Sequence, residues 1–229
     1  MSTVRLRDVP DWSYLLKEYY EFYRYLPSGG SAKIRSHQRA VREAIGRVRQ
    51  EGAPMIFRPA EEKPAVAHLR RALDEGRLEK FASLIRSIDA VKHTLCWQYG
   101  YESVPKGLAG KYAFAEFAGP YGPVVIKDLI LGVVLFAPGT TYPNHAHQGI
   151  SESYICLSGA ISENDEGVLA PGSLLYNPPG KAHRITTATS EPSLLAYAWH
   201  GAPEELAQQK MEFSRVRDTG KVPRSRPAK

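Results

Sequence analysis

Two histidines, a glutamate and a tyrosine lie within ten positions of one another in the segment GTTYPNHAHQGISESYICLSG, residues 139–159. Imidazole and carboxylate groups bind divalent Zn, Fe, Mn, Co or Ni, and an open position on such an ion can take a substrate oxygen. In a strand, His145 and His147 point to the same face, so both can reach one ion. Glu152 follows after the loop QGIS on the next strand, where the period of two places Tyr154 on the same side. The segment therefore predicts a site for one divalent transition metal.

A fourth ligand must come from elsewhere in the chain, and His183 is the candidate. Pro178, Pro179 and Gly180 form a turn sequence that can present the strand carrying His183 to the first strand. A single histidine in a strand is usually structural, but two histidines, a carboxylate and a third histidine after a turn favour a metal site. The remaining histidines are interpreted as structural or surface residues: His37, His68, His93 and His200.

Residues 1–111 are predicted to form a helical region that packs on the elements carrying these ligands. Apolar residues at spacings of three and four predict a helix from Asp11, its N-cap, to Leu26, and the sequence PSGG ends it. Three further helices are expected: one from Ser36 to the residue before Gly52, one from Pro64 to Gly76, and one with an apolar face from Leu78 to Val91. Residues 92–111 show no clear pattern.

Short apolar runs separated by Gly, Pro and Asn begin at about residue 112, for example AFAEFAG, DLILGVVLFAP and SLLAYAWHG. Such runs predict a sheet sandwich or barrel, here over residues 112–213, with a short last helix near Pro203 that carries Leu206 and Met211. The expected fold class is therefore mainly β with an α-helical N-terminal region. The tail, residues 214–229, contains proline and almost no large apolar residues, so it is expected to be disordered.

The net charge of +6 is concentrated in this tail, which holds six basic residues and one acidic residue. The rest of the chain has 24 basic and 23 acidic residues, which argues against nucleic acid as a partner. The sequence has no run of about 18 apolar residues, so no membrane span is predicted, and the N-terminus does not have the pattern of a signal peptide. A cytoplasmic protein is therefore expected. Cys96 and Cys156 lack the spacing of a disulfide framework or a zinc finger and are expected to be buried free thiols.

Two motifs resemble those of the cupin superfamily. The first consists of Gly139, His145, His147, Glu152 and Gly159, and the second of Gly172, Pro178, Pro179, Gly180 and His183. The second departs from the superfamily pattern only at its end, where Thr187 stands in place of a frequent Asn. The resemblance implies a cupin barrel, which is a double-stranded β-helix or jelly-roll, over about residues 112–200.

A narrower resemblance is to the cupin-type dimethylsulfoniopropionate (DMSP) lyases and, by length and N-terminal helices, to the branch called DddL. It is carried by the helical region, the runs AEFAGPYGP and LGVVLFAPGTTYPNHAH, and the tyrosine two residues after Glu152. It implies that His145, His147, Glu152 and His183 hold a divalent metal and that Tyr154 is the catalytic base. It also implies that Tyr142 lines the pocket, as a second candidate catalytic residue. One departure is the four-residue gap between His147 and Glu152, where several relatives have three residues.

Such an enzyme would cleave its small-molecule substrate DMSP by β-elimination to dimethyl sulfide and acrylate. The metal would stabilise the charge that develops at the substrate carboxylate, and a tyrosine phenolate would remove the proton from the neighbouring carbon. Aromatic faces can hold the sulfonium cation, for which Tyr142, Tyr176, Tyr197 and Trp199 are candidates. Two alternatives stay open: another metal cupin enzyme, such as a dioxygenase or isomerase, and a non-enzymatic small-molecule-binding or sensing cupin. A homodimer is expected.

Overall fold

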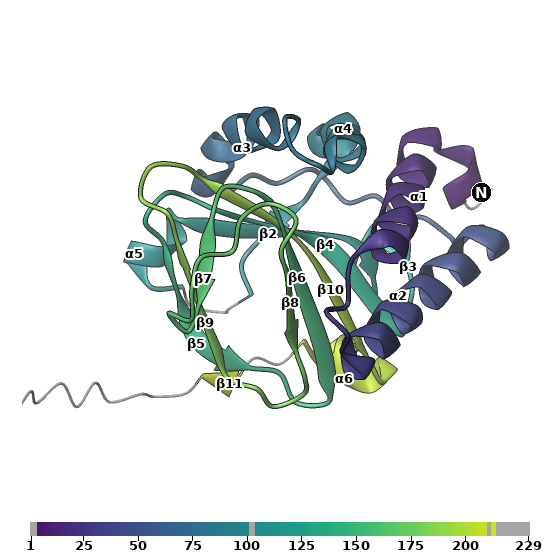
Figure 1. Cartoon of the computed structure of the whole chain (residues 1–229). Coiled ribbons are helices and arrows are strands. Elements are labelled where there is room, and N and C mark those ends of the chain that lie inside the picture. The colour runs from purple at the N-terminus through teal and green to yellow at the C-terminus, as the bar shows by residue number, and fades with distance from the viewer. Residues whose placement is uncertain (1–3, 101–103, 210–211, 214–229) are drawn as a thin grey trace, which may run out of the picture.

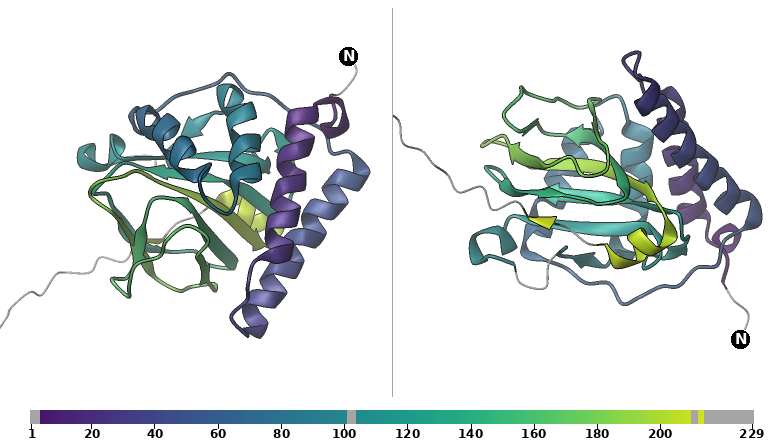
Figure 2. Two further views of the ribbon diagram at one scale, coloured as in Figure 1. Left: turned by 45° about the horizontal axis from the view of Figure 1, so that its top comes forward. Right: turned by 90° about the horizontal axis from the view of Figure 1, so that it is seen from below.

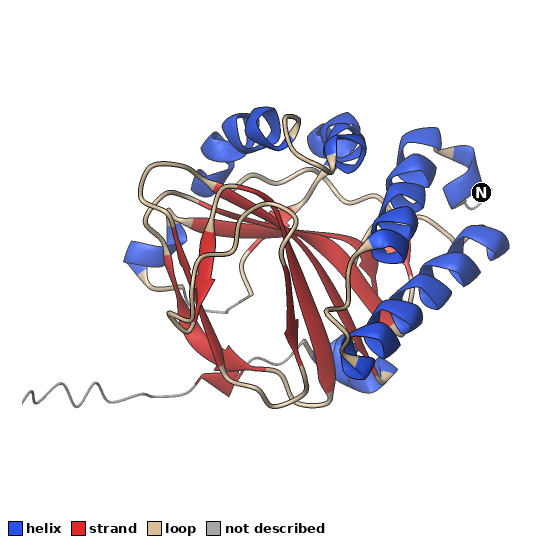
Figure 3. Ribbon diagram, viewed as in Figure 1, coloured by secondary structure: helices blue, strands red, loops and turns tan. Residues whose placement is uncertain are grey.

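The computed structural model describes residues 4–100, 104–209 and 212–213, in which helices come first and strands follow (Figures 1 and 3). The α-helices of these residues are α1 (Pro10–Tyr25), α2 (Ala32–Glu51), α3 (Leu69–Gly76), α4 (Ala82–Val91), α5 (Lys106–Ala109) and α6 (Pro203–Gln208). Short 3₁₀ segments span Leu6–Asp8, Pro64–His68 and Lys92–Thr94. The strands are β1 (Trp97–Gln98), β2 (Tyr112–Gly119), β3 (Val124–Val125), β4 (Leu129–Phe136), β5 (Thr141–Ala146), β6 (Ile150–Ser158), β7 (Ile161–Glu163), β8 (Leu174–Asn177), β9 (His183–Thr187), β10 (Ser193–Gly201) and β11 (Glu212–Phe213).

The first two helices lie where the apolar pattern predicts them, but each begins earlier than expected. Helix α1 begins at Pro10, because proline already has the φ angle of a first helical turn, so the prediction that Asp11 is the N-cap was wrong. Helix α2 begins before the expected start at Ser36, because the hydroxyl of Ser31 accepts a hydrogen bond from a backbone amide of the first turn at 3.3 Å. A proline at the first helical position of α1 and a side-chain cap at α2, rather than the apolar stripe, therefore set the two starts.

The next segments differ more from the expectation. The segment that was predicted to begin a helix at Pro64 is a 3₁₀ turn, and α3 follows it. Helix α4 begins only at Ala82, so Leu78 lies outside it and is 88% exposed. Cys156 is buried as predicted, but Cys96 is only half-buried. The last helix, α6, buries Leu206, whereas Met211 and the tail 214–229 lie outside the described residues.

The strands form two sheets that face each other, and helices α1–α4 lie outside the larger one (Figures 1 and 2). Within the described residues, the larger sheet has seven strands in the order β1-β2-β4-β10-β6-β8, with β3 paired to β2, and the smaller sheet has the order β11-β5-β9-β7. Among the named strands of the described residues, β2 and β3 pair in parallel, and the other pairs are antiparallel. Strand β1 lies in the range predicted as helical, so the larger sheet begins before residue 112. The two sheets make the barrel expected of a cupin.

Side chains of the larger sheet alternate between two apolar cores. On β6, Tyr154 and Cys156 lie in the barrel interior, whereas Ile155 and Leu157 pack under the helices. Every residue of β4 is buried, because one face of this strand meets the helices and the other faces the interior. The apolar stripes of the N-terminal helices therefore pack against a surface of the same chain.

In the described part of the chain, no helix has both the length and the hydrophobicity of a membrane span.

A buried polar cluster joins the helices to β6. The hydroxyl of Ser153 lies 2.8 Å from both the Tyr23 hydroxyl of α1 and the His37 Nε2 of α2. All three residues are buried, so these contacts compensate for the loss of hydration. His37 is thus the structural residue that the sequence predicts, and it fixes the strand between Glu152 and Tyr154 from behind.

Burial, together with His200, lowers the pKa of His37 from 6.5 to about 4. Between these two pH values the unfolded chain binds a proton that the folded chain does not, so folding stability falls as the pH falls. The free energy of unfolding of the native chain should therefore fall between pH 7 and pH 4. We expect this fall to be larger than that of the variant His37→Gln by up to about 3 kcal/mol. Urea unfolding of chelator-treated protein at each pH measures this difference. The same substitution at exposed His93 should follow the native curve, and parallel curves for native chain and His37→Gln would contradict the prediction.

Candidate metal centre

A bulge in β5 turns Tyr142 and His145 to the same side of the strand. Their partners on β9, Ile185 and His183, are two residues apart, whereas Tyr142 and His145 are three apart. A regular strand would send residues at this spacing to opposite faces, but one extra residue restores the common face. Pro143 lies in this bulge. Proline is tolerated at a bulge because its missing N–H leaves no gap in the hydrogen-bond ladder. Tyr142 and His145 are therefore both buried, with ring centroids 5.0 Å apart.

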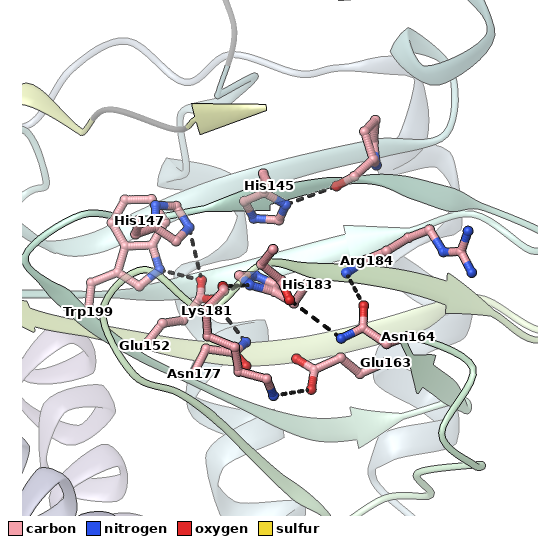
Figure 4. A network of polar contacts seen from close by, with 12 residues as sticks. His145, His147, Glu152, Glu163, Asn164, Asn177, Lys181, His183, Arg184 and Trp199 are labelled. Atoms are coloured by element: carbon pink, nitrogen blue, oxygen red, sulfur yellow. Dashed lines mark hydrogen bonds and ion pairs between the residues drawn. The ribbon is translucent and has the colours of Figure 1, made fainter. Parts of the chain in front are cut away.

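The three histidines predicted from the sequence lie together in the barrel interior (Figure 4). One nitrogen of each of His145, His147 and His183 lies within 4.8 Å of the others, and all three residues are buried. His145 and His183 are direct cross-strand partners, with ring centroids 4.2 Å apart. The turn Pro178-Pro179-Gly180 is tied to the end of β5, because the Gly180 amide donates to the His147 carbonyl at 2.8 Å. Gly180 has a φ of 78°, a backbone conformation that favours glycine.

Backbone carbonyls set the tautomers of two of these histidines. The Nδ1 of His145 lies 2.9 Å from the Pro143 carbonyl oxygen, and the Nδ1 of His183 lies 3.1 Å from the Lys181 carbonyl oxygen. A carbonyl oxygen can only accept, so each Nδ1 carries the proton and each neutral ring keeps a lone pair on Nε2. This is the arrangement by which proteins orient metal-binding imidazoles. The residues present therefore fit a divalent cation.

Glu152 supplies a carboxylate next to this histidine cluster. Its Oε2 lies 2.9 Å from the His183 Nε2, and its Oε1 lies 3.6 Å from the His147 Nε2. Strand β6 runs between β10 and β8, and the residues directly opposite Glu152 are Trp199 and Asn177. The indole N–H of Trp199 donates to Oε1 at 2.6 Å, and the side-chain amide of Asn177 donates to Oε2 at 3.3 Å (Figure 4). The carboxylate is fully buried and is held from both neighbouring strands.

An aromatic cavity of about 340 Å³ begins beside this cluster. It is lined by Gln98, Tyr99, Gly100, Tyr112, Phe114, Glu116, Ile130, Val134, Phe136, Tyr142, Tyr154, Tyr197, Trp199, Gln208 and Gln209. Tyr154 lies two residues beyond Glu152 on the same face of β6, and its ring centroid is 6.3 Å from that of His183. Both tyrosines singled out from the sequence, Tyr154 and Tyr142, thus border the cavity and the histidines.

Comparison with known proteins agrees with this geometry. The model of the dimethylsulfoniopropionate (DMSP) lyase family matches residues 36–195, which include all four candidate ligands and both tyrosines. The chain is also 50% identical over 217 residues to the "Putative dimethylsulfoniopropionate lyase DddL" of Cereibacter sphaeroides, covering 95% of this chain and 94% of that protein. The chain belongs to the DMSP lyase family. Membership of this family makes it a carbon–sulfur lyase.

Solved structures of DMSP lyases share its fold. The match to a structure from the work "Crystal structures of DMSP lyases RdDddP and RnDddQII" has a TM-score of 0.67 at 22% identity and covers 90% of this chain and 98% of that one. The match to DMSP lyase DddQ from Ruegeria pomeroyi DSS-3 has a TM-score of 0.62 at 20% identity and covers 84% and 92% of the two chains. At these identities the DMSP lyase structures support the barrel itself.

Charge in the cluster is governed by Glu152. Burial by itself would raise the pKa of this carboxyl, but His147, His183 and His145 hold it below its usual value. Burial and the neighbouring His183 lower the pKa of His145 to about 3, so this imidazole is neutral at physiological pH. Burial also opposes a charge on His183, yet the adjacent Glu152 carboxylate raises the pKa of this residue. The carboxylate therefore favours one positive charge among the imidazoles, either a proton or a metal cation.

Sequence reasoning missed part of the site and misplaced one residue. Asn177 was not predicted, and Trp199 was expected to contact substrate but also binds Glu152. The contacts of Asn177 and Trp199 with Glu152 depend on cross-strand register, which no local sequence pattern reveals. Tyr176, a candidate for holding a sulfonium, is wrong for that role, because it lies on the helix side of β8 with its ring centroid 5.2 Å from that of His37. In the described residues, it is not part of the cavity wall.

The variant Trp199→Phe tests how the carboxylate is held. It keeps an aromatic ring but removes the N–H that donates to Glu152, so we expect metal affinity to fall about 10- to 100-fold. Titration of the chelator-treated protein with Zn²⁺ or Co²⁺ measures this affinity. Trp12→Phe, in the core under the helices, is the matched control and should bind the metal as the native chain does. Equal affinities for Trp199→Phe and the native chain would show that the indole does not support the ligand.

Proposed function

We propose that this chain cleaves DMSP by β-elimination to dimethyl sulfide and acrylate, with one divalent transition metal held by His145, His147, Glu152 and His183. The observation that carries the proposal is a buried cluster of three imidazoles and one carboxylate at the wall of an aromatic cavity, in a member of the DMSP lyase family. Tyr154 is the general base in this proposal. The homodimer and the cytoplasmic location expected from the sequence stay predictions.

The difficulty of the reaction lies in removing a proton from the carbon beside a carboxylate anion. A divalent cation at the histidine cluster would act as a Lewis acid on the substrate carboxylate and lower the cost of this step. The chain's own contribution is to hold the substrate between the cluster and the aromatic wall. That wall is largely apolar, and exclusion of water strengthens every charge interaction inside the cavity.

The position of Tyr154 supports its role as the base in this proposal. Its position two residues beyond Glu152 keeps its ring next to the histidines, in the same cavity that would hold the substrate. In the reaction the phenolate oxygen of Tyr154 forms a bond to the α-proton, and the electrons of the Cα–H bond form the new double bond. The Cβ–S bond breaks and its electron pair leaves with sulfur, so the sulfonium becomes neutral dimethyl sulfide and acrylate remains. No redox partner is needed.

Two other tyrosines of the wall serve different roles. Burial, with Glu116 nearby, raises the pKa of Tyr197 well above its usual value, so this phenol stays protonated and does not compete as a base. Tyr142 packs between the rings of Tyr112 and His145, with centroids at 4.9 and 5.0 Å. Tyr142 therefore shapes the wall beside the cluster, and we assign it to substrate positioning rather than to proton transfer.

The central test is incubation of the purified protein with DMSP after loading with Fe²⁺, Mn²⁺, Zn²⁺, Co²⁺ or Ni²⁺. We expect dimethyl sulfide in the headspace and acrylate in solution in equal amounts, measured by gas and liquid chromatography. Protein treated with chelator should release neither product until metal is returned. Absence of dimethyl sulfide with all five metals would overturn the proposed function.

Single substitutions separate the roles of the site residues. Tyr154→Phe should lower kcat about 10²- to 10⁴-fold with little change in bound metal, because it removes only the base. His147→Ala should lose both metal and turnover, since it removes a ligand. Tyr142→Phe should keep measurable turnover, and Tyr14→Phe, at an exposed position of α1, should match the native chain. Full turnover by Tyr154→Phe would refute the assignment of the base even if the lyase activity is real.

A further inference from the structure

Glu116 is the charged residue of the cavity wall. Among the described residues that border the cavity, every other side chain is aromatic, aliphatic or an uncharged amide. Glu116 lies on the interior face of β2, two residues beyond Phe114, and is only 5% exposed. A carboxylate buried in such a wall costs free energy unless a partner compensates for it. Its place in the cavity therefore calls for an explanation that the proton-transfer step does not provide.

Strand register places Glu116 on the opposite side of the cavity from Tyr154. Across the larger sheet, Glu116 faces Gly132 of β4, Gly132 faces Tyr197 of β10, and Tyr197 faces Tyr154 of β6. Gly132 leaves room for the aromatic ring, because a Cβ there would lie 2.7 Å from the ring of Tyr197. Tyr197 thus occupies the floor between Glu116 and Tyr154, and the ring of Phe114 stands 6.3 Å from it at an angle of 80°.

The hydrogen bonds of Glu116 fix its carboxylate without neutralising it. Its Oε1 accepts from the Tyr121 amide at 3.1 Å, its Oε2 accepts from the Gln209 side chain at 3.0 Å, and the Gly122 backbone amide also donates to the carboxylate. Within the part of the chain that the structure describes, no lysine, arginine or histidine forms an ion pair with it. Burial raises the pKa of Glu116 despite these hydrogen bonds and the more distant charge of Arg58. A cation in the cavity would supply the compensation that the chain's own groups do not.

We infer that Glu116 selects a cationic tail in the substrate and lies opposite the sulfonium of DMSP, with Phe114 and Tyr197 beside it. The inference rests on the proposed function. A sulfonium has no N–H, so it is recognised by charge and by aromatic faces rather than by hydrogen bonds. The hydrogen bonds from Tyr121 and Gln209 hold the carboxylate at the wall, where it attracts the cation without moving forward to attack its methyl groups. Glu116 is thus a specificity-determining residue rather than a group that moves a proton.

A neutral isostere separates this role from a structural one. In 4-methylpentanoate a CH group replaces the sulfonium sulfur of DMSP, so shape and carboxylate are kept and the positive charge is lost. Isothermal titration of metal-loaded Tyr154→Phe, which should consume DMSP about 10²- to 10⁴-fold more slowly than the native protein, compares the two ligands. We expect Glu116→Gln in this background to weaken DMSP binding about tenfold or more and to change 4-methylpentanoate binding less than twofold. A structural role would weaken both ligands equally, and that outcome, or no change in either, would overturn the inference.

Two further measurements guard against misfolding of the variant. The parent itself must bind DMSP more tightly than 4-methylpentanoate, which needs no change at position 116. The double variant Glu116→Gln with Gln209→Glu moves the carboxylate to the other side of a 3.0 Å hydrogen bond and should recover part of the preference for DMSP. Glu75→Gln, on α3 outside the barrel, is the control and should leave both affinities unchanged. If the native protein cleaves DMSP but the Tyr154→Phe parent shows no preference over the isostere, only the role of Glu116 fails. If the native protein does not cleave DMSP and the parent does not bind it, the proposed function fails as well.

Discussion

The burial of one carboxylate constrains much of this barrel. Glu152 is fully buried, and a buried charge is tolerated only where hydrogen bonds and opposite charge compensate for its lost hydration. Trp199 and Asn177 donate to it from the two neighbouring strands, and His183 approaches it from the facing sheet at 2.9 Å. These partners belong to segments far apart in the sequence. A shift of one residue in any of these strands would turn a partner to the other face, so the compensation of Glu152 requires the observed register.

The histidines depend on backbone geometry in the same way. The bulge at Pro143 brings Tyr142 and His145 to one face, and the Pro143 carbonyl fixes the proton of the His145 ring. The Lys181 carbonyl does the same for His183 after the Pro-Pro-Gly turn. Each ring is thus oriented by the residue two positions before it. The bulge in β5 and the segment before β9 therefore decide which imidazole nitrogen faces the centre of the cluster.

Local periodicity and motif spacing were enough to predict the barrel, the helical region and the convergence of His145, His147 and His183. They could not predict contacts set by pairing between distant strands, and so Asn177 was missed and the N–H of Trp199 was given no ligand-holding role. Tyr176 shows the same limit, since an aromatic residue in a strand can face either core and only register decides which. The first residues of the helices were predicted wrongly for a different reason. An apolar stripe reports the buried face of a helix, whereas its first residue depends on caps such as Ser31.

The cavity has opposite electrostatic preferences on its two sides, and this matters for the kind of molecule it can hold. The histidine cluster favours a cation that would in turn attract an anion, while the wall around Glu116 favours a positive charge directly. A simple carboxylic acid would satisfy the first side and leave Glu116 uncompensated. A simple cation would do the reverse. A short zwitterion compensates both at once, and because each uncompensated buried charge is costly, the protein can discriminate by charge placement even though most of the wall is aromatic and adapts to many shapes.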